Sequence, residues 1–244
     1  MPTISKAMIL AGGKATRLHS LTQDRPKPML SVGGRPLVEH TIRQLASYGV
    51  REAGMNLFQS PDAVTAHFGD GSRFGLKLHY AVEPEPLGTA GALRAFRPLF
   101  ADGPFFVVYG DNLTTCDFTA LAAAHERHGG IATVALFWRD DVTKHSAVQI
   151  DSDDRIWQFI EKPRAEEAPS PWISAGMMVL EPKVFDYLPP TGLCDIGFHL
   201  FPALLAAGEP MYGYYMRDDE GLWWIDTPAD YERVRSLWQE GFPS

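Results

Sequence analysis

The chain has 244 residues, of which 45% are hydrophobic and 21% are charged, so it can bury one sizeable core. Its formal net charge of −8 argues against nucleic acid or an anionic membrane as a partner, because both need a broad basic face. Neither a basic leader nor a long apolar run follows Met1, so we expect no signal peptide, no membrane span and a cytoplasmic location. Cys116 and Cys194 lack metal-ligand spacing and are expected to be reduced thiols.

Apolar runs bounded by turns alternate with segments of helical period, a pattern typical of an α/β fold. In chain order, we expect a strand at Lys6–Leu10, a helix at Pro36–Tyr48, strands at Ala53–Leu57 and Leu76–Ala81, a helix at Ala90–Phe96, a strand at Phe105–Tyr109, a helix at Thr119–His128, strands at Thr133–Trp138, Ala147–Ile150 and Met177–Leu180, and helices at Phe198–Ala207 and Ala229–Glu240. No repeat or low-complexity tract interrupts this series, so residues 1–244 are predicted to form a single domain.

Positive charge is concentrated near the N-terminus although the chain as a whole is acidic. The first 35 residues contain one acid, Asp24, and the basic residues Lys6, Lys14, Arg17, Arg25, Lys27 and Arg35. Small residues with accessible backbone N–H groups beside cations suit a polyphosphate, and Gly12–Arg17 has this composition. The run lacks the third glycine of GxGxxG, and it does not fit the GxxxxGK[ST] pattern either. On the glycines alone, a tight turn without a ligand is an equally good interpretation.

Two acids follow apolar runs, Asp111 after the strand Phe105–Tyr109 and Asp226 just before the C-terminal helix. Ligands of open α/β sheets gather at the carboxyl ends of strands, where a carboxylate can hold Mg²⁺ together with phosphate oxygens. Helix capping or an Asx-turn is the alternative for both acids. The pair is informative only if the fold brings its members together.

The segment Glu83–Leu93 is a proline-containing loop that enters a helix through small residues. Gly88 and Gly91 allow a ligand or a strand to approach the backbone closely. A surface loop followed by a tightly packed helix start explains the segment equally well.

Taken together, these segments resemble the sugar-1-phosphate nucleotidyltransferase family over nearly the whole chain. The family pattern LAGGxGTRLxPLTxxxPKPM is matched by Leu10–Thr22 and Pro26–Met29. The match continues in order through Glu85–Leu93, Gly110-Asp111, Glu161-Lys162-Pro163 and Ser174-Ala175-Gly176. The proline loop is similar to that of mannose-1-phosphate guanylyltransferases, and Trp224–Pro228 is similar to the ending of glucose-1-phosphate cytidylyltransferase-like members.

The resemblance implies a GT-A-like, Rossmann-related α/β fold, in which helices cover both faces of a mixed central sheet. It implies an enzyme that joins a nucleoside triphosphate to a sugar 1-phosphate and releases pyrophosphate, with Mg²⁺ as cofactor. No C-terminal β-helix extension is expected, and the protein is expected to be a monomer or a homodimer.

The resemblance also implies four sets of site residues. The implied catalytic residues are Arg17, Lys27 and Asp111, and the implied metal ligands are Asp111 and Asp226. The implied nucleotide-binding residues are Leu10, Ala11, Gly12, Gly13, Lys14, Ala15, Thr16, Glu83, Pro86, Gly88 and Thr89. The implied sugar-phosphate-binding residues are Asn112, Ser146, Glu161, Lys162, Ala175 and Gly176.

The chemistry of such a reaction accounts for these residue types. The second pKa of a phosphate monoester is about 6, so the attacking oxygen is mostly ionised at pH 7 and needs no general base. The obstacle is the approach of one anion to another, in line with the departing pyrophosphate. Arg17, Lys27 and Lys162 supply opposing charge, as does Mg²⁺.

Three positions depart from the family pattern. Ala15 stands where glycine is usual, and its Cβ disfavours a left-handed backbone. The motif around Asp226 is shortened, and we expect this residue to remain a metal ligand. Ser146 replaces a glycine, which leaves mannose, heptose and cyclitol phosphates open as acceptors, and a solvated turn is its alternative interpretation.

The choice of base depends on Glu83, which stands where thymidylyl-transferring relatives carry glutamine. A carboxylate can accept hydrogen bonds from both N1–H and N2–H₂ of guanine, whereas uracil and thymine offer one imide donor. The residue type therefore favours GTP over UTP, dTTP, CTP and ATP, unless Glu83 is simply exposed.

Two other functional classes are alternatives. A GT-A glycosyltransferase commonly uses a DxD motif, which Asp151-Ser152-Asp153 matches, but the flanking apolar runs predict a solvated hairpin turn there. A catalytically silent nucleotide-sugar sensor is the second alternative, and the retained charges Arg17, Lys27, Asp111 and Lys162 count against it.

Overall fold

The computed structural model describes residues 4–18, 21–22 and 25–239, so Glu240 of the expected C-terminal helix lies outside the described residues. The chain divides into two compact units. One, here called the β1 unit, contains Ser5–Pro86, Val108–Cys116 and the chain from Asp218 onward. The other, the β8 unit, contains Ile4, Leu87–Val107 and Asp117–Arg217. The expectation of a single domain stays a prediction.

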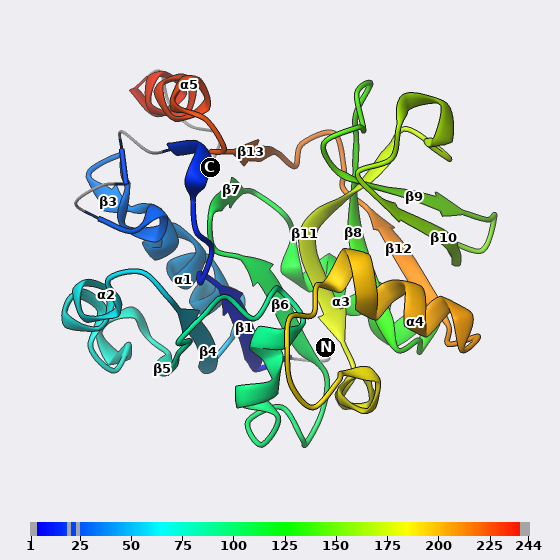
Figure 1. Ribbon diagram of the computed structural model, residues 1–244, viewed down its shortest axis with the longest axis horizontal. Helices are drawn as coiled ribbons and strands as arrows, with labels where there is room; N and C mark the ends of the chain where they lie inside the picture. The colour runs from blue at the N-terminus through cyan, green and yellow to red at the C-terminus, as the bar shows by residue number, and fades with distance from the viewer. Residues whose placement is uncertain (1–3, 19–20, 23–24, 240–244) are drawn as a thin grey trace. The chain divides into compact units, whose positions relative to one another are not determined.

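The β1 unit contains strands in the order β6-β1-β4-β5, and β1–β4 and β4–β5 pair in parallel (Figure 1). These strands are β1 (Lys6–Leu10), β4 (Glu52–Leu57), β5 (Lys77–Val82) and the last two residues of β6 (Phe105–Tyr109). The other elements of the unit are η1 (Thr16–Leu18), η2 (Lys27–Met29), β2 (Ser31–Val32), β3 (Arg35–Pro36), α1 (Leu37–Ser47), α2 (Pro61–Phe68), η3 (Ser72–Phe74), β7 (Asn112–Thr114), β13 (Leu222–Trp224) and α5 (Pro228–Gln239). Four of the five residues of β1 are buried, which explains its continuous apolar run.

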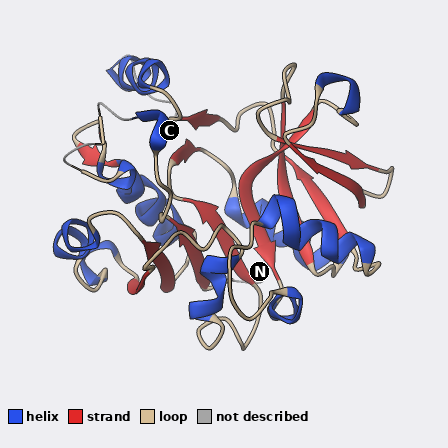
Figure 2. Cartoon of the chain, viewed as in Figure 1, coloured by secondary structure: helices blue, strands red, loops and turns tan. Residues whose placement is uncertain are grey.

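The β8 unit contains mostly antiparallel strands (Figure 2). Strands β10, β9, β11 and β6 follow one another in that order, and β8 pairs antiparallel with β11 and parallel with β12. The bounds are η4 (Gly91–Phe96), α3 (Phe118–His128), β8 (Ala132–Trp138), β9 (Ser146–Ile150), β10 (Ile156–Glu161), η5 (Ala165–Glu167), β11 (Trp172–Leu180), η6 (Pro182–Tyr187), the π-helix η7 (Ile196–Leu200), α4 (Phe201–Ala206) and β12 (Met211–Tyr215). Parallel and antiparallel pairs both occur, so the predicted α/β fold with a mixed sheet is confirmed.

Most predicted elements agree with the structure. Strands β1 and β6 have the predicted bounds, and α1 differs only in that Pro36 and Tyr48 are its flanking cap residues. The predicted helix at Ala90–Phe96 is a 3₁₀-helix, and the predicted helix at Phe198–Ala207 begins as the π-helix η7 and continues as α4. The predicted strand at Met177–Leu180 is the end of a longer strand, β11, whose register shifts between Ser174 and Met178.

Helix α3 packs against β8, β11 and β12 and carries a buried polar network. Asp117 caps its first turn by accepting hydrogen bonds from the N–H groups of Thr119 and Ala120. On the buried face, His125 Nδ1 lies 2.9 Å from Thr133 Oγ1 and His125 Nε2 lies 3.1 Å from Glu181 Oε1. Burial lowers the pKa of His125, so the imidazole is neutral at pH 7 and joins the helix to the strand through hydrogen bonds.

A small apolar cluster in the β1 unit includes the sequence neighbours of three predicted site residues, Arg17, Asn112 and Asp226. It consists of Leu18, Leu30, Val32, Leu37, Leu113, Ile225, Tyr231 and Val234, with Leu21, Trp223 and Trp238 packed against it. Trp238 on α5 lies over Gly33 of the β2–β3 turn, where the backbone is left-handed with φ +57°. An added Cβ at Gly33 would lie 2.0 Å from the indole nitrogen of Trp238.

We expect Gly33→Ala to destabilise the protein more than Gly34→Ala, its matched control. Gly34 is also left-handed, with φ +77°, but a Cβ there would meet no atom within 4 Å. Both substitutions carry a backbone cost of about 1 kcal/mol, and only the first adds an overpacking cost of about 1–3 kcal/mol against a rigid indole. Urea denaturation followed by circular dichroism measures both free energies of unfolding. Equal free energies of unfolding for the two variants would show that the packing of Trp238 on Gly33 does not contribute to stability.

Candidate active site

Pairing of two short strands brings Asp111 and Asp226 together. Strands β7 and β13 pair antiparallel in the β1 unit, with Trp224 opposite Asn112. Asp111 directly precedes this pair on one strand, and Asp226 follows it by two residues on the other. The two acids are 115 positions apart in the chain, and the register of this ribbon makes them neighbours.

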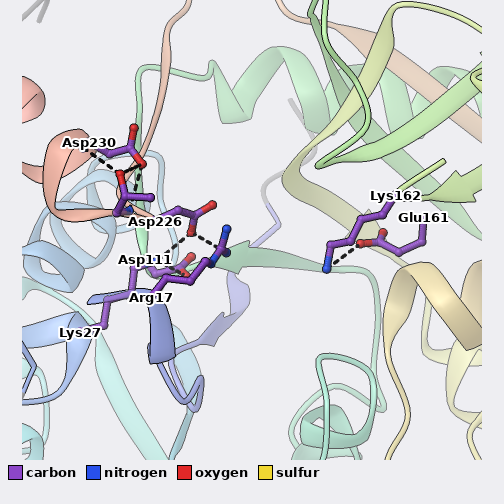
Figure 3. A network of polar contacts seen from close by, with 8 residues as sticks. Arg17, Lys27, Asp111, Glu161, Lys162, Asp226 and Asp230 are labelled. Carbon is purple, nitrogen blue, oxygen red and sulfur yellow. Dashed lines mark hydrogen bonds and ion pairs between the residues drawn. The ribbon is translucent and has the colours of Figure 1, made fainter. Parts of the chain in front are cut away.

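The ammonium group of Lys27 bridges the two carboxylates (Figure 3). Its Nζ lies 2.7 Å from Asp111 Oδ2 and 3.3 Å from Asp226 Oδ1. The Lys27 side chain is 8% exposed, whereas those of Asp111 and Asp226 are 36% and 30% exposed. Arg17 adds a second cation, with Nη2 at 3.2 Å from Asp226 Oδ1 and a side chain that is mostly exposed. The four charged residues predicted from separate motifs therefore form one network.

Capping does not account for Asp226. The first turn of α5 is held by Thr227 and Asp230: Asp230 Oδ2 accepts from the Thr227 N–H, and the Asp230 N–H donates to Thr227 Oγ1. This reciprocal pair is a capping box and satisfies the start of the helix. The Asp226 side chain bonds to Arg17 and Lys27 instead, so the capping interpretation is wrong for this residue.

The loop predicted to hold a triphosphate follows β1 and is largely exposed. Gly13, Lys14, Thr16 and Arg17 are exposed, Leu10 and Gly12 are buried, and Ala11 and Ala15 are half-buried. Ala15 adopts the left-handed conformation with φ +49° in spite of its Cβ. This conformation costs a non-glycine residue about 1–2 kcal/mol, and such strain is concentrated at functional sites.

Glu83 lies at the carboxyl end of β5 and is 6% exposed, so the interpretation of Glu83 as a simply exposed loop residue is wrong. Its Oε1 accepts a hydrogen bond of 2.9 Å from Asn56 Nδ2. Asn56 Oδ1 in turn accepts from the backbone N–H of Ala11, also at 2.9 Å. Sequence reasoning missed Asn56, although an amide near the end of the apolar strand Ala53–Leu57 was an available signal.

The predicted nucleotide-binding residues Pro86, Gly88 and Thr89 are half-buried; Pro86 belongs to the β1 unit and the other two to the β8 unit. Within the β8 unit, the Thr89 N–H donates to Asp195 Oδ1 at 3.0 Å, and Thr89 Oγ1 accepts from the Ile196 N–H at 2.8 Å. Gly88 has φ +79°, and a Cβ there would lie 2.5 Å from the carbonyl oxygen of Cys194. These contacts hold the middle of the Glu83–Leu93 segment against the turn before η7.

Cys116 and Cys194 are not joined in a disulfide, and both are buried. Burial raises the pKa of the Cys194 thiol, so this group stays protonated at neutral pH.

A second polar cluster lies in the β8 unit, where β9 and β10 pair with Ser146 opposite Glu161 (Figure 3 shows Glu161 and Lys162). Ser146 Oγ donates a hydrogen bond to Glu161 Oε2. Lys162 has a left-handed backbone with φ +49°, and its Nζ lies 3.7 Å from Glu161 Oε1. The same ammonium lies 5.7 Å from the centroid of the Phe198 ring, within the range of a cation–π contact. Ser146 is therefore a partner of Glu161.

Gly197 of η7 packs against the Glu161 side chain. An added Cβ at Gly197 would lie 2.2 Å from Glu161 Oε2, so the carboxylate occupies the space that a side chain would fill. Sequence reasoning missed this glycine, because its partner is 36 residues away in the chain. Ala175 and Gly176 are buried in β11, where the register shifts and Gly176 has φ +78°.

The structure thus groups the predicted residues unit by unit. Arg17, Lys27, Asp111 and Asp226 form one network in the β1 unit, and Ser146, Glu161 and Lys162 form another group in the β8 unit. Asn112, predicted to bind the sugar phosphate, is not in the second group: it is buried on β7 in the β1 unit. The roles of all these residues stay predictions.

The charged network has the donors that Mg²⁺ prefers. Mg²⁺ is usually held by one or two carboxylates together with substrate phosphates and waters. Asp111 and Asp226 are two partly exposed carboxylates on one ammonium group, which fits this description. Among the described residues there is no cluster of three or more histidine, cysteine, aspartate or glutamate side chains that would bind a metal by itself.

The Asp151-Ser152-Asp153 segment is a turn, as predicted, between β9 and β10. Asp151 Oδ1 accepts hydrogen bonds from the backbone N–H groups of Asp153 and Arg155, at 2.9 and 3.0 Å. The first carboxylate of the DxD-like segment is therefore engaged in its own turn.

A family model described as nucleotidyl transferase matches residues 6–239, which is nearly the whole chain. The chain belongs to the nucleotidyl transferase family. The resemblance inferred from the ordered motifs is thereby confirmed at the level of the family. In the part of the chain that the structure describes, no helix is both long enough and apolar enough to cross a membrane.

Individual relatives carry different nucleotide specificities in their names. The chain is 35% identical to a UTP–glucose-1-phosphate uridylyltransferase of Synechocystis, over 95% of this chain and 63% of the relative. It is 34% identical to a mannose-1-phosphate guanylyltransferase of Mycobacterium tuberculosis, over 93% of this chain and 62% of the relative. The chain therefore spans less than two thirds of the length of these relatives.

Solved structures share the fold. A protein from Bacillus anthracis assigned as a glucose-1-phosphate thymidylyltransferase, crystallised with sucrose, has a TM-score of 0.85 and 25% identity, covering 95% of this chain and 94% of that one. An inositol-1-phosphate CTP transferase from T. maritima has a TM-score of 0.80 and 22% identity, with 98% of each chain covered, which shows the fold alone.

Proposed function

We propose that this protein transfers a nucleoside monophosphate from a nucleoside triphosphate to a sugar 1-phosphate and releases pyrophosphate. The observation that carries the proposal is the convergence of Lys27 and Arg17 on Asp111 and Asp226. Cations and carboxylates brought together from four chain segments suit the neutralisation and alignment of a polyphosphate. Membership in the nucleotidyl transferase family supports the same reaction class.

Each charged residue has a task in this reaction. The Gly12–Arg17 loop wraps the triphosphate with its backbone N–H groups, while Arg17 neutralises phosphate oxygens. Lys27 is almost fully covered and held by two carboxylates, so its ammonium is preorganised for the charge that develops at the reacting phosphorus. Asp111 and Asp226 hold Mg²⁺, which neutralises phosphate oxygens when bound.

The acceptor binds to the group in the β8 unit. Ser146 occupies one lone pair of the Glu161 carboxylate, and the other lone pairs accept hydrogen bonds from sugar hydroxyls. Lys162 neutralises the sugar phosphate. The phosphate of the acceptor is already mostly ionised at pH 7, so no residue is needed as a general base. The acceptor is a sugar 1-phosphate of the mannose or heptose type, or a cyclitol phosphate.

GTP is the proposed nucleotide. Glu83 is buried. Its Oε1 accepts a hydrogen bond from Asn56 Nδ2, because Asn56 Oδ1 already accepts from the Ala11 N–H. The Glu83 carboxyl group therefore acts as an acceptor. Such a group pairs with N1–H and N2–H₂ of guanine, and the chain is similar to mannose-1-phosphate guanylyltransferases. A cytoplasmic location, where nucleoside triphosphates are made and used, belongs to the same proposal.

The test is pyrophosphate release from GTP, ITP, UTP, dTTP, CTP or ATP, each with mannose 1-phosphate, glucose 1-phosphate, a heptose 1-phosphate and an inositol phosphate. We expect GTP to give the highest kcat/KM. ITP lacks the N2 amino group and is expected to have a kcat/KM about 5- to 150-fold lower, since an unpaired buried acceptor costs about 1–3 kcal/mol. Higher activity with a pyrimidine nucleotide would reject the role of Glu83. No pyrophosphate from any pair would reject the reaction, and consumption of a sugar nucleotide instead would indicate a glycosyltransferase.

A further inference from the structure

The side-chain amide of Asn56 connects the carboxyl ends of three neighbouring strands in the β1 unit. The strands β1, β4 and β5 are adjacent and parallel. Ala11 follows β1, Asn56 lies near the end of β4, and Glu83 follows β5. Ligands of parallel sheets bind at this edge. The amide therefore lies between the start of the predicted phosphate loop and the predicted base-reading carboxylate.

The hydrogen bonds fix which end of the amide faces each partner. The backbone N–H of Ala11 can only donate, so the Asn56 atom that faces it at 2.9 Å must be the acceptor Oδ1. Nδ2 then points to Glu83 Oε1, also at 2.9 Å, and this carboxylate oxygen must accept. Asn56 and Glu83 are 5% and 6% exposed, so water does not replace either bond easily.

Gly12 shares this arrangement. An added Cβ at Gly12 would lie 2.3 Å from Asn56 Nδ2 and 3.4 Å from Glu83 Oε2. The backbone of the predicted phosphate loop thus packs directly on the amide and the carboxylate.

We propose that Asn56 is a positioning residue that couples base recognition to triphosphate binding. It holds the Glu83 carboxylate as a fixed acceptor and ties it to the first turn of the Gly12–Arg17 loop. This inference depends on the proposed function, because it assigns Glu83 to the base and the loop to the phosphates. Asn56 touches neither substrate and acts through Ala11 and Glu83.

The test compares two probes, GTP and inorganic tripolyphosphate, by calorimetric titration without a sugar phosphate. The ratio of their dissociation constants measures what the nucleoside adds to binding, and its change between variants measures the contribution of the base, because the ribose is the same in every titration. In Asn56→Asp, the side chain still accepts from Ala11 but presents an oxygen to Glu83 Oε1, so the two acids repel. We expect the affinity for tripolyphosphate to stay within threefold of wild type and the contribution of the base to fall at least tenfold. In Asn56→Ala, both bonds are lost, and both affinities are expected to fall.

The paired exchange Asn56→Asp with Glu83→Gln separates this role from general stability. It reverses acid and amide, so the new amide can donate to the new carboxylate, and we expect it to recover most of the thermal stability lost in Asn56→Asp. The base contribution is expected to stay low, because an amide cannot accept both donors of guanine as a carboxylate does. Gln149→Glu on β9 makes the same change of charge outside the predicted site and is expected to bind both probes as wild type does.

Two results would overturn the inference: a base contribution in Asn56→Asp within threefold of wild type, or no recovery of stability in the paired exchange. If Asn56→Asp does not fold, folding of the paired exchange decides: a folded double variant supports the contact between residues 56 and 83, and one that also fails to fold overturns the inference. A failure of the proposed function is recognised separately, because wild-type protein would then bind neither probe or release no pyrophosphate.

Discussion

Replacing Lys27 by methionine is expected to lower kcat by about 10²–10³-fold, the usual cost of removing one preorganised electrostatic contact. Methionine keeps most of the apolar stem and removes the charge that bridges Asp111 and Asp226. The two carboxylates then face each other without their shared cation. The reacting phosphorus of the nucleotide also loses the positive charge of a nearly buried ammonium group. The measurement is the initial rate of pyrophosphate release at saturating nucleotide and acceptor.

Folding is checked in the same variant. Asp111 and Asp226 are each about one third exposed, so water screens part of their repulsion and the variant is expected to unfold cooperatively. Lys77→Met, on the exposed side of β5, removes a lysine charge away from the network and is expected to keep wild-type kcat. Wild-type turnover in folded Lys27→Met protein would remove Lys27 from the mechanism.

Gly197→Ala is expected to lower kcat/KM for the sugar phosphate by about 10²-fold, since a displacement of about 1 Å in a positioning group costs that much. The new Cβ would lie 2.2 Å from Glu161 Oε2, and the flexible carboxylate has to move away from it and from Ser146. Binding of GTP alone is expected to stay unchanged, because the affected residues belong to the acceptor group. Steady-state kinetics with each substrate varied in turn measures both effects.

Stability and activity should change independently in this variant. Alanine is more favourable than glycine within a helical segment by about 0.5–1 kcal/mol, so Gly197→Ala is expected to be as stable as wild type. Gly103→Ala is the control, because a Cβ there meets no atom within 4 Å. If Gly197→Ala retains wild-type kcat/KM for every acceptor, the contact between Gly197 and Glu161 has no part in acceptor binding.

Local patterns predicted the elements whose signals are continuous. Strands β1 and β6 agree to the residue because each is a short, mostly apolar run between turns, with four of its five residues buried. The signal fails where the backbone departs from a regular period. The register shift in β11 and the π-helix η7 each changed the bounds of a predicted element.

Elements with few buried residues were missed. Helix α2 buries only Val64 and Phe68, which is too short a pattern to identify a helix. Strand β12 contains Gly213 within the sequence Met-Tyr-Gly-Tyr-Tyr, and it forms by parallel pairing with β8. In both segments tertiary packing outweighed the local preference.

The sequence by itself determined the composition of the phosphate loop, the charges of the candidate site and the family. The tertiary structure decided which of those charges meet. The β7–β13 register places Asp226 beside Asp111, Thr227 and Asp230 cap α5 in its place, and Asn56 joins Ala11 to Glu83. A sequence pattern reports which residues are neighbours within one strand or helix, because backbone geometry repeats over a few residues. Contacts between distant segments depend on strand order and register, which are set by the packing of the whole unit.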